Sequence, residues 1–508
     1  MEALSRSSKI FSEEDLYAQV KEMITERGLQ ASGNALFRGA VFGRDSLWTA
    51  RFLIAHQDIA HLVLTSLAQT QGTRHVPQRE EEPGKIAHEY RRSDDPNANQ
   101  EILQMFQKTY GQTVPGAYII YTTVDATPLW VVLLGEYCER YGRSILSERV
   151  EHITGEEITI GEVMIRAAKW IEKKIHESEL GLLETIRENG DGHAEFHVLR
   201  DGKISYRHED GKYPNLVRPL AYLEVQGYAY DALTYASEMI SHLKRSQSVR
   251  WKALARRLQA KTFELFWQSD RETFAAALDR DPASDEVRAL QMLSTVQPEI
   301  LNSGIFDSLP KEEKFHYIAG VLKNFFTPEF QTSAGPRSIA LRYKSLTDFY
   351  AYQGPETMWP ILAHLVARGL SRQGYFALAY DIAARMVNTV QAAGSPRELF
   401  YITGEADEVV LDPEEVYAEG DEVIEIYATN TGEANQTWTI AALLEAKSNI
   451  LNALPDISDF EKGLLGREMT QLLDEAGLEA SYSKRRRATI NFKEGNERQA
   501  RLVEQIHW

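Results

Sequence analysis

The sequence has almost no cysteine and no long apolar segment. Cys138 is its one cysteine in 508 residues, so no intrachain disulfide can form and a cysteine-based metal site is not expected. No apolar run approaches the roughly 18 to 20 residues that span a bilayer. The N-terminal stretch MEALSRSSKIFSEEDLY lacks the apolar core of a signal peptide. These absences favour a protein of the reducing cytoplasm that binds no membrane.

Positive charge is also scarce. Lys and Arg number 56 against 74 Asp and Glu, which gives a formal net charge of −18. Such a balance argues against nucleic acid and anionic membrane surfaces as partners. Apolar residues make up 43% and charged residues 26% of the chain, as in ordinary globular proteins. A neutral substrate is the partner most compatible with this charge.

No linker rich in Gly, Ser or Pro, no low-complexity tract and no tight repeat divides the chain. Apolar residues instead recur at spacings of three and four, which predicts roughly a dozen helices. The predicted helices cover residues 13–29, 46–57, 59–71, 127–142, 162–179, 224–243, 248–268, 311–326, 358–370, 374–392 and 437–451. A solenoid would show a period of about 30 to 45 residues. Because none is visible, we expect one large all-α domain of helix pairs closed into a ring, over residues 1–455.

The connections between the predicted helices carry the polar and aromatic residues. Strand-like pieces occur there at residues 117–124, 197–206 and 422–430. Several connections place carboxylates beside Trp, Tyr or Phe, which suits a sugar, since its C–H face packs on a ring and its hydroxyls bind the carboxylates. Each feature also has a plain structural interpretation. Arg44 and Asp45 could pair and cap a helix, Asp125 could cap another, and Glu80 to Glu82 could form a solvated face.

Histidines do not indicate a metal centre. The spacings of His193, His197 and His208 fit no helix-face or hairpin ligand pattern, so we expect no metal. The final stretch, residues 456–508, differs in composition and contains the run Arg485 to Arg487. We expect a C-terminal extension that packs on the main domain or is partly mobile, with the arginines on a solvated face or a docking arm.

Four segments, in order, resemble a known family. They are FGRDSLWTARFL, TQGTRHVPQREEEPGKIAHEYR, YTTVDATPLWVVLLGEY and LAYLEVQGYAYDAL, and the series continues with SAGPRSIA, YQGPETMWP, SPRELF and ANQTWTIAALL. Over roughly residues 30 to 450 the chain resembles the C-terminal glucosidase domain of glycogen-debranching enzymes. These amylo-alpha-1,6-glucosidases form glycoside hydrolase family 133 and are related to family 63. The resemblance implies an (α/α)6 toroid of the six-hairpin glycosidase type, with short strands in its loops and the active site in the central cavity.

The resemblance also implies inverting hydrolysis of a terminal α-linked glucose. This chemistry needs one carboxylic acid to protonate the leaving oxygen and one carboxylate to activate water, about 6.5 to 9.5 Å apart. By spacing, the family's acid falls on Asp201 in LRDGKIS, with Glu195 and Asp191 as rivals. The family's base falls on Glu398 in SPRELF. Water is the only co-substrate, and no cofactor is implied.

By the same resemblance, a further set of residues should bind the terminal sugar. Arg44 and Asp45 would hold its hydroxyls rather than merely cap a helix. Trp359 and Trp438 would form walls of the pocket, whereas Trp48 and Trp130 would lie in the core. The remaining expected sugar-binding residues are Lys85, Glu89, Asp125 and Gln226.

Some loops depart from the family pattern, which leaves the substrate open. The acid's motif has Leu199 and Gly202 where the family has Trp and Ser, Gln353 replaces an Asn, and Glu356 adds a carboxylate. A short α-gluco-oligosaccharide is as good a candidate as an α-1,6-linked glucan. Alternatives are trehalose, a glucosyl- or mannosyl-glycerate, or a mannoside. A sugar isomerase would want central histidines, and a non-catalytic glycan-binding protein is the third class. The oligomeric state is open.

Overall fold

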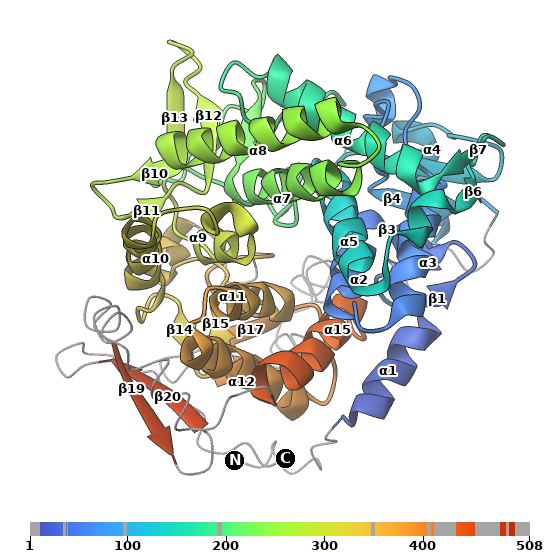
Figure 1. Ribbon diagram of the computed structural model, residues 1–508. Helices are drawn as coiled ribbons and strands as arrows, with labels where there is room; N and C mark the ends of the chain where they lie inside the picture. Colours follow the sequence, from blue (N-terminus) through green and yellow to red (C-terminus); the bar gives the residue numbers. More distant parts are fainter. Residues whose placement is uncertain are drawn as a thin grey trace.

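The computed structural model describes residues 11–33, 37, 39–94, 99–189, 196–346, 351–403, 408–410, 433–452, 478–483 and 487–492. Within them the chain is mainly helical, with short strands in the connections, and this confirms the predicted class. The helices form an inner and an outer set (Figure 1).

Six helical segments of the described residues surround the centre of the molecule. Each contacts the next, and the last contacts the first, so the ring is closed (Figure 1). In order they are α2 (Gly43–Phe52), α5 (Ala126–Tyr141), α7 (Leu223–Met239), the short α9 (Val296–Glu299) with the 3-10 turn η4 (Ile300–Asn302), α11 (Pro360–Arg372) and α15 (Thr437–Glu445).

An outer helix packs against each inner one. The pairs are α3 (Gln57–Ala68) on α2, α6 (Ile160–Glu177) on α5, α8 (Arg245–Phe266) on α7, α10 (Lys311–Phe325) on α9, α12 (Phe376–Ala393) on α11, and α1 (Glu13–Glu22) on α15. In five of the pairs the outer helix is the next one along the chain after its inner partner. The first helix completes the last pair, so the chain closes on itself instead of extending as a solenoid.

The two sets differ in sequence as their positions require. The outer helix α6 buries one face, at Ile160, Val163, Met164, Ala167 and further residues at the same spacing. It begins with a capping box in which Thr159 and Glu162 exchange hydrogen bonds. The inner helix α5 is instead buried on all sides from Ala126 to Gly135, because neighbours surround it.

Short strands lead into the inner helices. The sheet β3-β4-β5 (Ala40–Phe42, Glu89–Arg92, Ala117–Ile120) precedes α2 and α5. In the sheet β13-β12-β9-β8 (Val287–Leu290, Ala277–Arg280, Leu220–Tyr222, Glu184–Thr185), β9 leads directly into α7. In the sheet β16-β17-β18 (Thr357–Met358, Phe400–Thr403, Glu408–Val410), β16 leads into α11. All strand pairs in these sheets are antiparallel.

One strand prediction is wrong, one is confirmed and one is untested. Residues 117–124 do contain β5. Residues 197–206 form bends and turns rather than a strand, because buried side chains such as Arg200 fix this segment. Residues 422–430 lie outside the described residues.

The remaining elements are small. They are α4 (Gln100–Thr109), which the periodicity did not reveal, the 3-10 turns η2 (Pro77–Arg79), η3 (Ser144–Ser147), η5 (Gly304–Phe306) and η6 (Leu341–Leu346), the π turn η7 (Ala446–Leu451), and the hairpins β1-β2 (Ile24–Thr25, Gly28–Leu29), β6-β7 (Arg149–Glu151, Glu157–Thr159), β10-β11 (Trp267–Gln268, Thr273–Phe274), β14-β15 (Gln331–Thr332, Gly335–Pro336) and β19-β20 (Leu478–Ser483, Arg487–Phe492). The last hairpin contacts α12 through β20.

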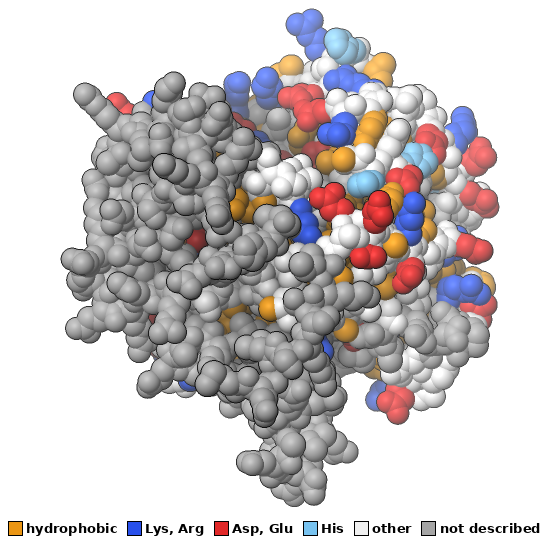
Figure 2. All heavy atoms as spheres, turned by 90° about the horizontal axis from the view of Figure 1, so that it is seen from below, with side chains coloured by type: hydrophobic (Ala, Val, Ile, Leu, Met, Phe, Trp, Pro, Cys, Tyr) orange, Lys and Arg blue, Asp and Glu red, His pale blue; other side chains and the backbone are white. Residues whose placement is uncertain are grey.

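Among the described helices, none has the length and apolar character to cross a membrane. Figure 2 shows one face of the molecule, on whose described part acidic and basic side chains are interspersed. On this part of the surface, the acidic side chains therefore do not form one continuous acidic patch.

Candidate active site

The polar cluster lies where the inner helices begin. Arg44 and Asp45 stand in the first turn of α2, and Asp125 directly precedes α5. The start of α2 is fixed by Gly43, whose N–H donates to the carbonyl of His88 at 2.6 Å. A Cβ at Gly43 would lie 2.2 Å from the carbonyl oxygen of Ala87, so a side chain has no room there. Close packing of Gly43 against the segment that leads into β4 thus places Arg44 and Asp45 at the end of the ring where the inner helices begin.

Arg44 joins two carboxylates from separate segments. Its Nη1 lies 3.4 Å from Asp125 Oδ2, and its Nη2 lies 3.3 Å from Asp201 Oδ2. Burial works against the guanidinium charge, but Asp125, Asp201 and Asp45 together raise the pKa of Arg44. Arg44 thus forms its ion pairs with Asp125 and Asp201 rather than with Asp45, and neither the start of α2 nor that of α5 has a side-chain cap hydrogen bond.

Asp45 is a buried carboxyl with a weak partner. Its Oδ1 accepts a hydrogen bond from Gln436 Nε2 at 3.3 Å. Burial raises the pKa of Asp45 to about 7, Arg44 opposes the shift, and the charges of Asp201 and Asp125 add to it. Near neutral pH this group exchanges between an acceptor-only carboxylate and a carboxylic acid that donates.

Asp201 stands on the open side of the cluster. Its side chain is 32% exposed, against 4% for that of Arg44. Burial against the surrounding protein raises the pKa of Asp201, the Arg44 charge lowers it, and the Asp125 charge raises it further. The neighbour Arg200 anchors the segment in the core, since its Nη2 lies 2.5 Å from Glu299 Oε2 and 2.9 Å from Thr295 Oγ1.

Glu398 is the most enclosed of the proposed catalytic groups. The Tyr352 hydroxyl donates to its Oε1 at 2.7 Å, and the Glu433 N–H donates to its Oε2 at 3.3 Å. Burial raises the pKa of Glu398 to about 8, the two hydrogen bonds lower it, and Asp45 and Glu433 raise it. Glu398 is 4% exposed.

The charges of these groups act on one another's pKa values. The pKa of Asp45 responds to Arg44, Asp125 and Asp201, and that of Glu398 responds to Asp45. Burial raises the pKa of the Tyr352 hydroxyl, and the charges of Glu398, Asp201 and Asp45 raise it further. With one guanidinium among several carboxyls, full ionisation is opposed, so part of the cluster stays protonated near neutral pH.

The expected aromatic walls lie beside this cluster. The ring of Trp359 packs edge-on to that of Tyr352 at 4.8 Å and lies 6.3 Å from that of Trp438. Trp359 and Trp438 are 1% and 4% exposed. Their buried Nε1 atoms have no hydrogen-bond partner among the described residues. Trp48 and Trp130 are core residues, as expected.

Other expected sugar-binding residues lie in separate contacts. Both amide hydrogens of Gln226 are donated to backbone carbonyls, of Leu183 and Tyr222, at 2.9 Å. Glu89 pairs with Arg91. Lys85 donates to the Glu80 carbonyl at 3.3 Å, and burial lowers the pKa of Lys85. The structure does not bring these three into the Arg44 cluster.

The sequence also singled out three other carboxyl residues, Glu356, Glu195 and Asp191. Glu356 pairs with Lys344 at 2.5 Å. Glu195 and Asp191, the rivals of Asp201, lie outside the described residues, as does His193.

The solvated-face interpretation of Glu80 to Glu82 is wrong. All three are buried, because each meets a partner that composition cannot reveal. Glu81 pairs with Arg79 at 2.5 Å and Glu82 with Lys174 at 2.8 Å. Glu80 accepts from the Asn189 N–H at 3.4 Å and lies 3.6 Å from the ring of His197. His208 likewise pairs with an aspartate, Asp279, at 3.1 Å.

Three residues of the cluster were not expected. Tyr352 and Gln353 stand in the loop YQGPETMWP, and Gln436 stands in ANQTW, both of which carry the resemblance. Their aromatic and amide side chains beside Trp359 and Trp438 were an available signal. Which loop carboxylate each would touch depends on the closed ring, which no local pattern shows.

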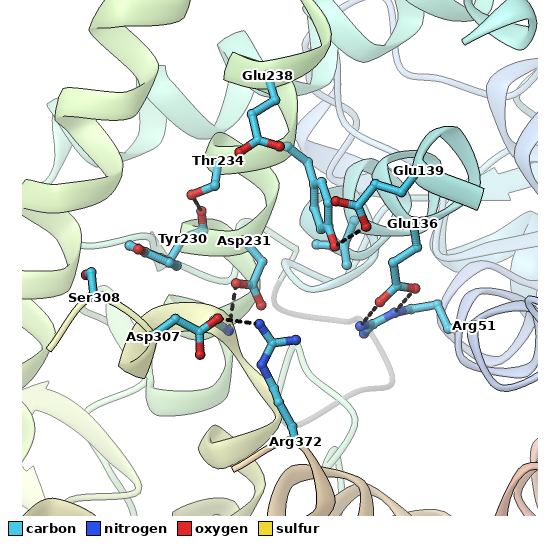
Figure 3. Close-up of a pocket in the computed structure, with 13 residues that line it drawn as sticks. Arg51, Glu136, Glu139, Tyr230, Asp231, Thr234, Glu238, Asp307, Ser308 and Arg372 are labelled. Atoms are coloured by element: carbon cyan, nitrogen blue, oxygen red, sulfur yellow. Dashed lines mark hydrogen bonds and ion pairs between the residues drawn. The ribbon is translucent and has the colours of Figure 1, made fainter. Parts of the chain in front are cut away.

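A second polar pocket lies toward the other ends of the inner helices. Its volume is about 320 Å³, and Figure 3 shows its lining residues, which come from α2, α5, α7, η5 and α11 and include Arg51, Glu136, Asp231, Asp307 and Arg372. Arg51 binds Glu136 through two hydrogen bonds of 2.7 and 3.0 Å. Arg372 lies 2.6 Å from Asp307. At 1.5 Å per residue, Arg51 stands about 10 Å along α2 from Arg44.

In the part of the chain that the structure describes, no group of three or more His, Cys, Asp or Glu could hold a metal ion.

No protein-family model and no curated protein matches the sequence. Solved structures do match. A GH63 mannosylglycerate hydrolase from Thermus thermophilus in complex with Tris superposes with a TM-score of 0.54 at 11% identity, covering 86% of this chain and 99% of that chain. Its glucose complex gives 0.53 at 10% identity over 86% and 99%. Its complex with Tris and D-glycerate gives 0.53 at 10% identity over 85% and 98%. The chain thus has the fold of that glycoside hydrolase.

Proposed function

We propose that the protein is an inverting, exo-acting α-glycoside hydrolase and that its helical ring is an (α/α)6 toroid of the six-hairpin glycosidase type. The observation that carries the proposal is the joining of Asp201, Arg44, Asp45 and Glu398 in one cluster at the start of the inner helices. These carboxyls come from three distant segments of the chain. Glycoside hydrolysis uses two carboxyls in different roles, and the inverting outcome is what the sequence resemblance implies.

The two carboxyls suit different roles. In an exo-acting pocket the leaving group departs through the open side, so the acid must face that side. Asp201 is the more exposed carboxyl and would protonate the glycosidic oxygen. Glu398 is enclosed, and would take a proton from the water that attacks the anomeric carbon as the carbon–oxygen bond breaks. Tyr352 and the Glu433 amide favour the carboxylate form that this role needs, against the burial that raises the pKa of Glu398 to about 8, so Glu398 would act as a base chiefly at the alkaline side of neutral pH.

The remaining groups would hold the sugar. Asp45 and Asp125 would accept hydrogen bonds from ring hydroxyls, and Arg44 would fix the relative positions of Asp125 and Asp201. Trp359 and Trp438 would pack on the apolar face of the ring. Lys85, Glu89 and Gln226 would act one layer further out. We also infer a cytoplasmic protein, with a catalytic domain over residues 1–455 and an extension over 456–508.

The first candidate substrate is a terminal glucose in α-1,6 linkage or at the end of a short α-gluco-oligosaccharide, which the resemblance to amylo-alpha-1,6-glucosidases favours. The second is a small α-glycoside such as mannosylglycerate or glucosylglycerate, which the likeness to mannosylglycerate hydrolase favours. The first candidate is neutral, whereas a glycerate glycoside is small and carries one carboxylate. Water is the co-substrate for both.

A release assay separates the candidates. The purified protein is incubated with isomaltose, panose, maltotriose, trehalose, glucosylglycerate, mannosylglycerate and a branched limit dextrin, and free monosaccharide is measured, with Glu398→Gln as the blank. Release from isomaltose, panose or the dextrin supports the first candidate, and release from a glycerate glycoside supports the second. Release from none, with a folded protein, would contradict the proposal and favour a glycan-binding protein.

A further inference from the structure

One buried side chain holds both ends of the segment that carries Asp201. The Gln353 Nε2 donates to the Leu199 carbonyl at 3.0 Å. Its Oε1 accepts from the Gly202 N–H at 3.1 Å and from the Ser205 hydroxyl at 2.7 Å. Gln353 is 2% exposed, so these bonds form away from competing water.

The backbone around Gln353 is shaped for this contact. Gln353 has a positive φ of 61°, an uncommon conformation for a residue with a side chain. Its own turn is closed by a 2.8 Å hydrogen bond from the Gly354 N–H to the Ala351 carbonyl. Across the contact, a Cβ on Gly202 would lie 2.9 Å from the Tyr352 carbonyl oxygen. The two loops therefore touch backbone to backbone.

The residue before Gln353 reaches the other proposed catalytic group. The Tyr352 hydroxyl donates to Glu398 Oε1 at 2.7 Å. One dipeptide thus contacts Glu398 through its first side chain and the Asp201 segment through its second.

Resting on the proposed function, we propose that Gln353 is a positioning residue that fixes the Asp201 carboxyl relative to Glu398 through the segment from Leu199 to Ser205. Gln353 does not touch the reacting atoms. The effect falls on the acid alone, because its three hydrogen bonds all go to the Asp201 segment.

Leaving groups that differ in their need for a proton test this role. An alkoxide leaving group needs the acid, whereas fluoride departs from a glycosyl fluoride without one, and both need the base. The test variant is Gln353→Met, which keeps the length of the side chain and removes its hydrogen bonds. The probes are the oxygen-linked substrate found in the release assay and the α-fluoride of the same sugar.

We expect kcat for the oxygen-linked substrate to fall on the order of 10- to 100-fold, because a shift of about 1 Å in a catalytic group has this effect. KM should change little, and hydrolysis of the fluoride should stay near the wild-type rate. Equal losses on both probes, or no loss on either, would overturn the inference. Wild-type protein inactive on both probes would instead overturn the proposed function.

Two further variants guard the result. Gln331→Met is the matched control, because Gln331 is also a buried glutamine bonded to a backbone carbonyl, that of Phe325 at 3.1 Å. It should show no dependence on the leaving group. If Gln353→Met does not fold, Gln353→Asn keeps the amide without adding a charge, and its shorter side chain cannot reach Leu199, Gly202 and Ser205 together. It should show the same dependence on the leaving group, with a smaller loss.

Discussion

The two ends of the inner helices use the same residue types in opposite ways. At the end where the helices begin, burial raises the pKa of Asp45, Asp125, Asp201 and Glu398, and Arg44 forms ion pairs with Asp125 and Asp201. At the other end, Arg51 and Arg368 lie against Glu136, and their attraction outweighs burial and lowers its pKa. Burial still raises the pKa of Asp231 there to about 6. The contrast is therefore between the carboxyls of the first end, whose burial is not offset and which can give and take protons, and the paired Glu136, which joins neighbouring helices.

Removing a carboxyl from the first end should have the largest effect on activity. Glu398→Gln keeps the shape and removes the proposed base, so kcat should fall on the order of 10⁴-fold. Steady-state rates on the substrate from the release assay and on its fluoride measure this. Both should fall, because both reactions need the base.

The same variant should lose activity without losing stability at high pH. A carboxyl whose pKa rises from 4.5 to about 8 on folding binds its proton more tightly in the folded state. It therefore lowers the free energy of unfolding progressively as pH rises from below 4.5 through 8. Glu398→Gln should be at least as stable as wild type at pH 8 in chemical denaturation. A strong destabilisation there would contradict this view of Glu398.

Breaking a pair at the second end should cost stability and leave activity intact. Arg51→Met leaves the Glu136 carboxylate with only Arg368, at 3.7 Å. The free energy of unfolding should fall by about 3 kcal/mol, with kcat unchanged. Arg372→Met, at a half-exposed pair, should cost less than about 1 kcal/mol. Equal costs, or a loss of kcat at either site, would erase the contrast between the two ends.

The smallest effect concerns the pH profile. The Tyr352 hydrogen bond lowers the pKa of Glu398, so Tyr352→Phe should raise it. The limb of the kcat/KM profile that Glu398 sets, near pH 8, should move up by about one pH unit. Tyr137→Phe, which loses a 2.8 Å hydrogen bond from Gln57 far from the cluster, is the control and should leave the limb in place. An unmoved limb in Tyr352→Phe would show that another group sets it.

Local patterns in the sequence predicted what depends on neighbours along the chain. The spacing of apolar residues located most of the helices, and two residues from conspicuous motifs, Arg44 and Asp201, form an ion pair in the structure. The resemblance assigned their roles, which remain proposals until tested.

The sequence could not predict what depends on distant partners. Glu81 and Glu82 look exposed until the fold brings Arg79 and Lys174 against them. Gln226 looks like a pocket residue until its amide meets the backbone of Leu183. The contacts of Tyr352 with Glu398 and of Gln436 with Asp45 depend on the closed ring, so the sequence alone could not predict them.

The measurement that tests the central claim most directly is proton NMR of the first sugar released by the wild-type protein. The anomeric signal is followed from the first minutes, before mutarotation mixes the forms. If Glu398 activates water while Asp201 protonates the leaving oxygen, as proposed, the β-anomer appears first from an α-linked substrate. Initial release of the α-anomer would contradict the account, since it would show a retaining reaction in which one carboxylate attacks the sugar itself.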